Sequence, residues 1–372
     1  MIIRQIQFVQ FRNHTALAFE PENGINLVFG SNGTGKTSIL EGIHYCCLTK
    51  GFISSYDMEC VTSGSSFFLV RGKFEADNKS EISVKITYSK DYGKQVSVNG
   101  TNISSFSDHI GTLPCLTFSP ADTSIVNGAP SERRRMLDNA ICQTDSIYLD
   151  SLIHYRRLLQ QRNALLTTRD NQLKDYSMLD VLTEQLAEKA VLIVQKRQAF
   201  LLSIMPELLR MHGIISGGEY PSITYRCSFY NGDTADLMKE KMYYQFLKYL
   251  KERRNEEITR GQTAAGPHRD DIHFFMKEKD VKKYASQGQK RTFIISLKLA
   301  LYEYFKEKKE EKPICLFDDI FSELDKERAG ALLSIMKQCG QTIITSTERL
   351  KDSCINAVNI HDLSPREKLR EE

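Results

Sequence analysis

Residues 30–37 read GSNGTGKT, and they follow the short apolar run Ile25–Phe29. This octet fits the pattern G-x-x-x-x-G-K-[ST], the phosphate-binding P-loop, at every fixed position. Its glycines let consecutive backbone N–H groups turn inward toward phosphate, and a helix expected from about Lys36 adds its dipole. We therefore predict a buried strand, a nucleotide-binding loop and a helix in succession, which is the start of an α/β fold.

The P-loop side chains predict a magnesium nucleotide, which we take to be ATP. Lys36 can reach the β- and γ-phosphates, and the hydroxyl of Thr37 can ligate Mg²⁺, which prefers oxygen ligands. The expected nucleotide contacts are Gly30, Ser31, Asn32, Gly33, Thr34, Gly35, Lys36 and Thr37.

A second motif, Asp318-Asp319, ends the apolar run Ile314–Phe317 and resembles a Walker B element. We expect Asp318 to hold Mg²⁺ through water and Asp319 to act as a general base or to position water. Alone, the pattern is usually explained by a buried strand that ends in solvated acids. The P-loop earlier in the chain favours the catalytic interpretation.

Ser286-Gln287-Gly288-Gln289 opens an expected helix that runs to about Phe305. Serine is a good N-cap, and Gly288 allows close backbone approach. Its place shortly before Asp318 matches the signature motif of ABC ATPases, with Gln287 in place of the first glycine of the common form. The resemblance implies that Ser286 and Gly288 meet the γ-phosphate held by a second subunit, so that catalysis requires a dimer.

Two further ABC elements are less complete. Residues 322–325 resemble the D-loop, although a capping box for a helix starting near Asp325 would explain them too. The expected strand Thr342–Thr345 leads into Ser346-Thr347, where many ABC proteins carry a switch histidine. No Q-loop glutamine stands out near residues 118–120, so both assignments stay open.

The secondary-structure pattern of the remaining sequence predicts one α/β domain, the head, which is interrupted by a helical insertion. The first 110 residues are strand-rich, with a hairpin near Val84–Val98, whereas Ser131–Arg210 has a helical pattern. A helix over Thr234–Arg254 follows, and strand and loop texture returns around Ile258. We predict an ABC-type α/β head, with a mixed or parallel sheet and an antiparallel β subdomain, from 1–128 and 256–372, and a mostly helical insertion lobe at 129–255.

Composition limits the class of protein. Fifty basic and 47 acidic residues give a formal charge of +3, so a nucleic-acid site must come from local clustering. Nine cysteines without C-x-x-C spacing favour reduced thiols, and we expect no zinc site. No signal peptide or uncharged apolar run of membrane-spanning length is apparent, so we expect a cytoplasmic protein without a membrane partner.

Specific segments across nearly the whole chain resemble the RecF family. They are the P-loop octet, residues 119–120 with 131–138, residues 155–166, residues 266–271 (GPHRDD) and residues 318–325. The resemblance implies ATP-dependent DNA binding and an ATP-dependent homodimer. It also implies action with RecR and RecO to load RecA at single-strand gaps, support for the SOS response, and weak DNA-stimulated ATP hydrolysis.

Candidate DNA contacts are clusters of cations, since phosphate contacts need positive charge but no fixed spacing. A solvated helix face is the ordinary explanation of each such cluster, and residues 133–135 could instead make internal salt bridges. His268 and Arg269 either line the nucleotide site or brace the lobes. The candidates are Arg133, Arg134, Arg135, Arg156, Arg157, Arg162, Lys251 and Arg254, with Lys248 and Arg253 beside the last two.

Three other functions compete with that of an ATP-dependent DNA-binding protein. An SMC-like structural ATPase would need long heptad arms, which residues 131–210 lack, and a transport ATPase would need a membrane partner. A nucleotide-switched scaffold that recruits RecR with little turnover stays open, because Asp319 replaces the glutamate common in fast ABC enzymes.

Overall fold

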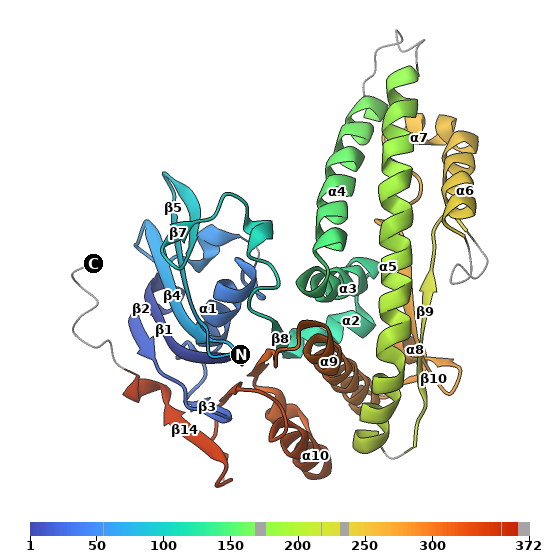
Figure 1. Ribbon diagram of the computed structural model, residues 1–372. Coiled ribbons are helices and arrows are strands. Elements are labelled where there is room, and N and C mark those ends of the chain that lie inside the picture. Colours follow the sequence, from blue (N-terminus) through green and yellow to red (C-terminus); the bar gives the residue numbers. More distant parts are fainter. Residues whose placement is uncertain (55, 168–175, 217, 231–237, 351, 364–372) are drawn as a thin grey trace. The chain divides into compact units, whose positions relative to one another are not determined.

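The computed structural model describes residues 1–54, 56–167, 176–216, 218–230, 238–350 and 352–363. The chain forms two compact units (Figure 1). The first comprises Met1–Asp122, Gly213–Gly217 and Ile295–Glu372, and the second comprises Thr123–His212 and Gly218–Ile294. The predicted helical lobe covered 129–255, whereas the second unit continues to Ile294. Thr234, where we predicted a helix to begin, lies outside the described residues.

The first unit contains a five-stranded parallel sheet in the order β14-β3-β13-β12-β8. Its central strands are almost fully buried and apolar, as parallel strands covered on both faces must be. Because all five strands run the same way, the residues that follow β3 and β12 come to one edge. The strands are β3 (Ile25–Phe29), β8 (Cys115–Phe118), β12 (Ile314–Asp318), β13 (Thr342–Ser346) and β14 (Ile355–Asn359).

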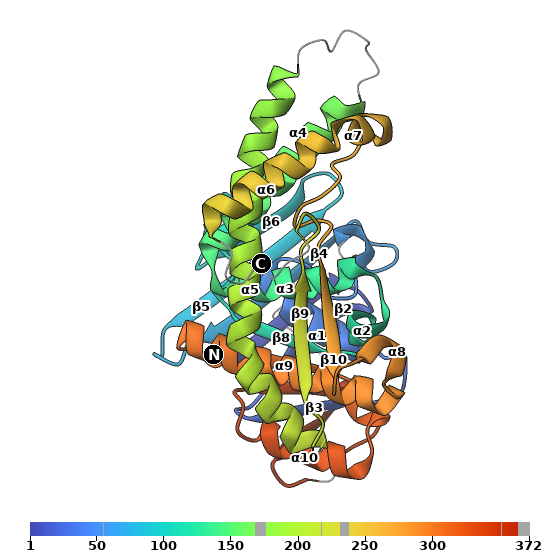
Figure 2. The same ribbon diagram turned by 90° about the vertical axis from the view of Figure 1, so that its right-hand side faces the viewer.

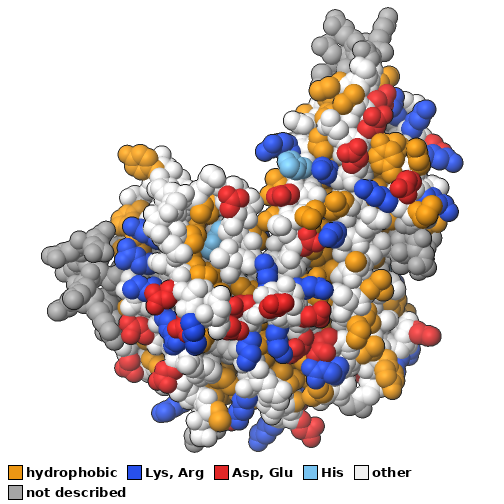
Figure 3. All heavy atoms as spheres, in the orientation of Figure 1, with side chains coloured by type: hydrophobic (Ala, Val, Ile, Leu, Met, Phe, Trp, Pro, Cys, Tyr) orange, Lys and Arg blue, Asp and Glu red, His pale blue; other side chains and the backbone are white. Residues whose placement is uncertain are grey.

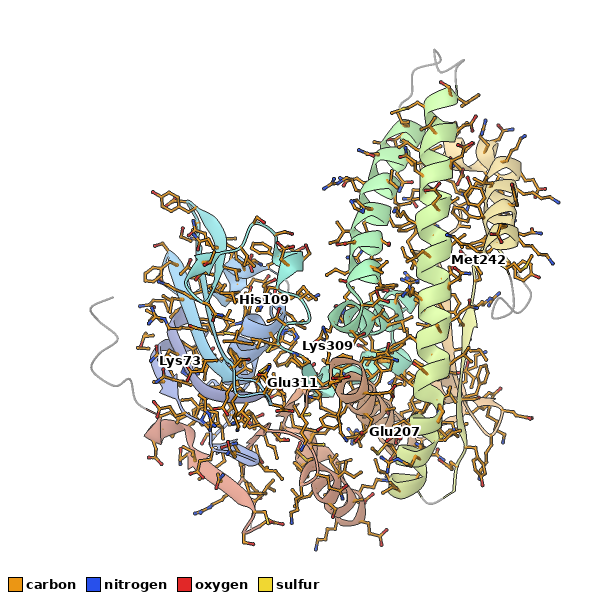
Figure 4. All side chains as sticks on the ribbon, in the orientation of Figure 1. Lys73, His109, Glu207, Met242, Lys309 and Glu311 are labelled. Carbon is orange, nitrogen blue, oxygen red and sulfur yellow. The ribbon has the colours of Figure 1, made fainter. Side chains whose placement is uncertain are left out.

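An antiparallel sheet in the order β2-β1-β4-β5-β6-β7 completes the β structure of this unit. The predicted hairpin near Val84–Val98 is confirmed, since β5 and β6 pair antiparallel. The N-terminal amine is tied down by ion pairs with Asp77 and with Glu311, which Figure 4 labels. The strands are β1 (Ile2–Phe11), β2 (His14–Phe19), β4 (Phe67–Glu75), β5 (Glu81–Ser89), β6 (Gly93–Val98) and β7 (Thr101–Asn102).

Helix α1 (Lys36–Leu48) contacts strands of both sheets. It is buried along nearly all its length, and its buried Glu41 is paired with Arg12 of the antiparallel-sheet region. The contact with the antiparallel sheet is close: a Cβ on Gly42 would lie 2.1 Å from Cε1 of Phe8. This packing fixes the helix that the P-loop opens. The other helix wholly in this unit, α10 (Lys326–Met336), follows β12.

The second unit is mostly helical and includes a three-stranded sheet, β11-β10-β9. Figure 2 shows β9 and β10 side by side, as their antiparallel pairing requires. Helix α9 (Gln287–Lys309) begins here and ends in the first unit. The other elements are α2 (Thr123–Asn127), α3 (Pro130–Thr144), α4 (Ser146–Thr167), α5 (Ser177–Ser216), β9 (Pro221–Arg226), α6 (Lys239–Glu252), α7 (Arg254–Arg260), β10 (Asp271–Met276), β11 (Lys279–Asp280) and α8 (Val281–Tyr284).

Two expectations were wrong in detail. Ile258 lies in helix α7, and strand structure returns only at Asp271. The segment 254–260 is polar enough to look like a loop, but Glu257 turns inward and holds a buried partner in α4, so tertiary contact decides its helical state. Strand β14 was not predicted, because the strand is short and most of its residues are half-exposed at the sheet edge.

Helix α5 is the one described helix that is long and apolar enough to cross a membrane by length and composition. Its inner face packs in the second unit, where Leu186, Ala190 and Val194 are fully buried. Arg197, on the same helix, is buried in an ion pair with Asp138. Packing in the second unit accounts for these apolar positions of α5, whereas Leu202 is exposed.

Candidate functional site

A hollow of about 360 Å³ lies where the P-loop and the ends of β12 and β13 meet. All its lining residues belong to the first unit. Most of them are the P-loop and the acidic pair that the sequence singled out. The lining comprises Asn13, Asn32, Gly33, Gly35, Lys36, Thr37, Ser38, Pro120, Asp318, Asp319 and Thr345.

The P-loop holds Lys36 over its own backbone. The Lys36 Nζ donates to the carbonyl oxygens of Gly30 and Ser31, both at 2.7 Å, and the side chain is 8% exposed. Gly35 has φ +90°, and a Cβ there would lie 2.6 Å from Nε2 of His14. Glycine is therefore required at position 35 for both backbone conformation and space. Carbonyl oxygens are weaker partners for an ammonium than phosphate oxygens, so an incoming triphosphate can replace them.

The turn between β1 and β2 supports the P-loop, a feature the sequence analysis missed. Asn13 Nδ2 donates to Gly33 O at 3.3 Å, and His14 Nε2 lies 3.0 Å from Gly35 O. A carbonyl oxygen can only accept, so this histidine nitrogen carries the proton. Burial lowers the pKa of His14, which keeps the ring neutral. Only the Asn-His pair itself, between two apolar strands, could have signalled these contacts.

Two hydroxyl groups converge on the Walker B carboxylate. Thr37 Oγ1 and Thr345 Oγ1 each donate to Asp318 Oδ1 at 2.7 Å. Thr345 is the register partner of Asp318 on the neighbouring strand, which explains the contact. Among the described residues no group of three His, Cys, Asp or Glu side chains could hold a metal ion. A hydroxyl and a carboxylate fit Mg²⁺ only if phosphate oxygens and water complete its shell, which is how Mg²⁺ usually binds nucleotides.

Asp319, at the same edge, has a left-handed backbone conformation and a carboxylate oxygen without a hydrogen bond to any described residue. Its φ is +46°, and its backbone N–H points to the carbonyl and hydroxyl oxygens of Thr345, each 3.2 Å away. Its Oδ1 is buried and has no hydrogen-bond partner in the part of the chain that the structure describes. An unsatisfied buried acceptor costs about 1–3 kcal/mol, so its retention calls for a reason. Accepting a hydrogen bond from a water molecule in the pocket would satisfy it.

Ser286 lies in the second unit, as the N-cap residue of α9. Ser286 Oγ accepts from Gln289 N at 3.2 Å, and Gln289 Oε1 accepts from Ser286 N at 2.8 Å, which is a capping box. Ser286 and Gln287 are exposed and Gly288 is half-buried. The predicted N-cap is therefore present, and the start of α9 lies open.

Asp325, in the D-loop segment, caps α10. Asp325 accepts from Arg328 N at 2.9 Å, and Ser322 Oγ instead donates to Asp319 O at 2.8 Å. The capping box that we considered for residues 322–325 is therefore wrong in detail.

The residues proposed to contact DNA fall into a buried group and an accessible group. Arg133 is 5% exposed and donates to both carboxylate oxygens of Asp271, at 2.8 and 3.1 Å. Arg162 is 2% exposed and binds Glu257 through two nitrogens, at 3.1 and 2.6 Å. Both arginines use their charge on internal carboxylates. Burial and these ion pairs disfavour both side chains as DNA contacts, and for Arg133 they support the internal salt bridge that the sequence left open.

The other candidates remain accessible to different degrees. Arg134 is half-buried and donates to Asp270 O at 2.6 Å, and Arg254 pairs with Asp180. Figure 3 shows basic and acidic side chains interspersed on the face drawn, in keeping with the balanced charge. Exposed candidates with charge at the surface are Arg135, Arg156, Arg157, Lys248, Lys251 and Arg253.

His268 and Arg269 brace the second unit internally. His268 Nδ1 lies 2.6 Å from the Tyr155 hydroxyl, and Arg269 Nε donates to Thr263 O at 3.0 Å. Burial lowers the pKa of His268 to about 4, so the ring is neutral at pH 7. Neither side chain lines the nucleotide pocket described above. Of our two interpretations for this pair, the contacts support bracing within the unit.

Comparison with known proteins places the chain in a family. The model of the RecF/RecN/SMC N terminal domain matches residues 2–362. The DNA replication and repair protein RecF of Chlorobium limicola is 52% identical over 360 residues, 97% of this chain and 99% of the relative. The RecF of Chlorobium phaeovibrioides is 49% identical over 367 residues, 98% of each chain.

Solved structures agree. A structure of the recombination mediator protein RecF with ATP, in the RecFOR pathway, superposes with a TM-score of 0.89 at 29% identity, covering 94% of this chain and 93% of that one. An SMC head bound to ScpA has a TM-score of 0.58 at 13% identity, covers 96% of this chain and 94% of that one, and supports the fold alone. The predicted ABC-type α/β fold is confirmed.

Proposed function

This chain belongs to the RecF family of DNA replication and repair proteins, and from that premise we propose that it is an ATP-dependent DNA-binding protein of recombinational repair. The observation that carries the proposal is the convergence of Lys36, Thr37 and Asp318 in one pocket. A relative solved with ATP superposes over nearly the whole chain, which supports ATP as the nucleotide.

In the proposed complex the P-loop binds the phosphates of ATP. Lys36 contacts the β- and γ-phosphates, and Thr37 with Asp318 holds Mg²⁺, which neutralises phosphate charge. Asp319 positions the attacking water through its free Oδ1. The roles of the glycines and of Ser31, Asn32 and Thr34 follow from their places in the same loop.

The site is completed by a second copy of the chain. The exposed Ser286 and the start of α9 offer a hydroxyl and the positive end of a 23-residue helix. These groups suit the γ-phosphate bound by the partner's P-loop. ATP therefore closes a homodimer, and hydrolysis, stimulated weakly by DNA, opens it.

The closed dimer clamps DNA near single-strand gaps and helps RecO and RecR load RecA, which supports the SOS response. Relatives named for replication and repair, and a solved relative titled for the RecFOR pathway, support this assignment. The exposed cations Arg135, Arg156, Arg157 and Lys251 are the proposed phosphate contacts. Affinity should fall steeply with salt, with a slope of about −0.9 per neutralised phosphate in a log–log plot.

The test compares Lys36→Ala with Ser286→Arg in ATP binding and in sedimentation with and without ATP. Lys36→Ala should lose both ATP binding and dimerisation, whereas Ser286→Arg should keep ATP binding and stay monomeric. Arg210→Ala, an exposed change on α5, is the matched control. ATP-dependent dimers of Ser286→Arg would overturn the shared site, and a flat salt response would overturn the phosphate clamp.

A second candidate is a nucleotide-switched scaffold that recruits RecR with little turnover. Asp319, shorter than glutamate and held at φ +46°, favours slow hydrolysis. Measuring ATP turnover with and without gapped DNA separates the two functions. Stimulation by DNA supports the clamp, and equal, very slow rates support the scaffold.

A further inference from the structure

Gln289 holds the Ser286 loop in place through a single orientation of its amide. Its Oε1 accepts from Ser286 N, and its Nε2 donates to Glu219 Oε1 at 2.6 Å. A backbone N–H needs an acceptor and a carboxylate needs a donor, so only one of the two amide orientations satisfies both neighbours. Glu219 therefore decides which way the amide of Gln289 points.

Glu219 comes from the short connection between α5 and β9, and it is 25% exposed. A charge-assisted hydrogen bond at 2.6 Å in this setting is stronger than one between neutral groups. Its other oxygen, Oε2, lies 3.9 Å from Nε2 of His212, which is fully buried near the end of α5. The carboxylate thus links the end of α5 to the first turn of α9.

The same end of α5 packs on α9. The rings of His212 and Phe293 meet edge to face, with centroids 6.5 Å apart and an interplanar angle of 63°. On α9 itself the buried Lys290 donates to Asn127 Oδ1 at 3.0 Å and to Lys282 O at 2.8 Å. Lys290 therefore anchors the first turn of α9 to neighbouring segments, and the hydrogen bond to Glu219 links the Gln289 side chain to the segment after α5.

We propose that Glu219 is a positioning residue for Ser286: by fixing the Gln289 amide it holds the signature loop in the shape that receives the partner's γ-phosphate. This inference rests on the proposed function of Ser286. Two hydrogen bonds, from Gln289 to Glu219 and from Ser286 N to Gln289, thus connect Glu219 with Ser286. Glu219 is not among the residues that line the nucleotide pocket, and its proposed effect on Ser286 passes through Gln289.

The experiment is a double-mutant cycle that reverses the hydrogen bond. Gln289→Glu keeps the capping box, because a carboxylate at this position also accepts from Ser286 N, but it sets two carboxylates against each other. Adding Glu219→Gln supplies an amide that donates to the new carboxylate. Glu219→Ala removes the contact, and Glu207→Ala, a comparably exposed acid on α5 (24%), is the matched control, labelled in Figure 4.

Two quantities are measured: ATP affinity of the monomer, and the dissociation constant of the ATP-bound dimer. Glu219→Ala and Gln289→Glu should each weaken the dimer about fivefold to tenfold, the size of one lost hydrogen bond, with ATP affinity unchanged. The combined variant Gln289→Glu/Glu219→Gln should return to near the wild-type value. A merely structural role would not produce this recovery.

Dimerisation of Glu219→Ala equal to that of the control overturns the proposal. So does a double variant no better than Gln289→Glu alone, and this comparison decides the matter if Glu219→Ala fails to fold. Ser286→Arg separates the two levels of argument. If that variant still dimerises with ATP, the proposed function fails as well; if it does not, only the role of Glu219 is in question.

Discussion

Replacing Arg162 with methionine should strongly lower the unfolding midpoint of the second unit, and it should leave DNA binding unchanged. The Arg162 guanidinium makes two bonds to Glu257, one to Thr183 and one to Thr263, and both charged side chains are at most 2% exposed. Methionine fills similar space but leaves the Glu257 carboxylate buried without its cation.

The cost follows from that burial. Removing one partner of a buried pair costs about 3–5 kcal/mol, because the remaining charge keeps its desolvation penalty. For a unit of about 150–250 residues each kcal/mol lowers the unfolding midpoint by roughly 2–4 °C, so we expect a fall of about 6–20 °C. Adding Glu257→Gln should recover more than half, since a neutral amide oxygen can still accept from Ala264 N.

Thermal unfolding by circular dichroism measures the midpoint, with Arg157→Ala, an exposed change on the same helix, as control. That control should stay within about 0.5 kcal/mol of wild type. DNA affinity of Arg162→Met, taken well below its midpoint, should match wild type in magnitude and salt slope. A variant with an unchanged midpoint but weakened DNA binding would refute the reasoning from burial.

The remaining predictions concern the pocket and two titrating groups. Thr345→Val removes one of two hydroxyl donors from the Walker B carboxylate, and calorimetry should show ATP binding about fivefold weaker with Mg²⁺ and unchanged in EDTA; equal loss in both would contradict a role at the metal. Burial alone would raise the pKa of Asp271, but hydrogen bonds from Arg133 outweigh it and lower that pKa. The ionised Asp271 therefore stabilises the fold fully above its ordinary pKa of 3.8, and this stabilisation is lost as the pH falls below 3.8. Urea unfolding of Asp271→Asn should therefore depend less on pH below 3.8, and an unaltered acid limb would count against the pair. Burial lowers the pKa of His268 from 6.5 to about 4, so stability is complete above pH 6.5 and falls toward pH 4, where the unfolded chain binds the proton first. His268→Asn should lose less stability over that range, although His44, lowered to about 4 in the same way, keeps some of the slope; a slope equal to wild type would show that His268 is not buried neutral.

Local sequence was sufficient for the nucleotide pocket because its chemistry is mostly contiguous. The P-loop needs a strand, three glycines and a helix start in one stretch, and the strand Ile314–Asp318 ends in acids by its own composition. Thr345 was read only as part of a strand. Its role as a donor to Asp318 depends on parallel register between β12 and β13, which no single segment encodes.

The contacts of Asn13 and His14 with the P-loop could not be predicted from the sequence, for a related reason. They brace the P-loop from a turn some distance earlier in the chain, and one polar pair between strands is an ordinary turn signal. The same limit applied to the basic clusters. A run of three arginines is equally typical of a DNA face and of a helix whose inner positions meet carboxylates. Only the rotation of α3 shows that Arg133 points inward and Arg135 outward.

The segments that point most specifically to the RecF family are those that interlock inside the second unit. Arg134 on α3 binds the carbonyl of Asp270, and Arg197 on α5 binds both Asp138 and the carbonyl of Pro267. Burial raises the pKa of Asp270, which is held by Tyr225 and by a backbone N–H.

Such a network tolerates little change, because each buried charge is stable only with its own partner and a lone one costs several kcal/mol. An exposed DNA face imposes no such demand, since any cation at roughly the right place serves a phosphate. Residues 131–138 and 266–271 hold α3, α5 and β10 together through such contacts. The proposed DNA contacts should therefore be sought among the exposed cations.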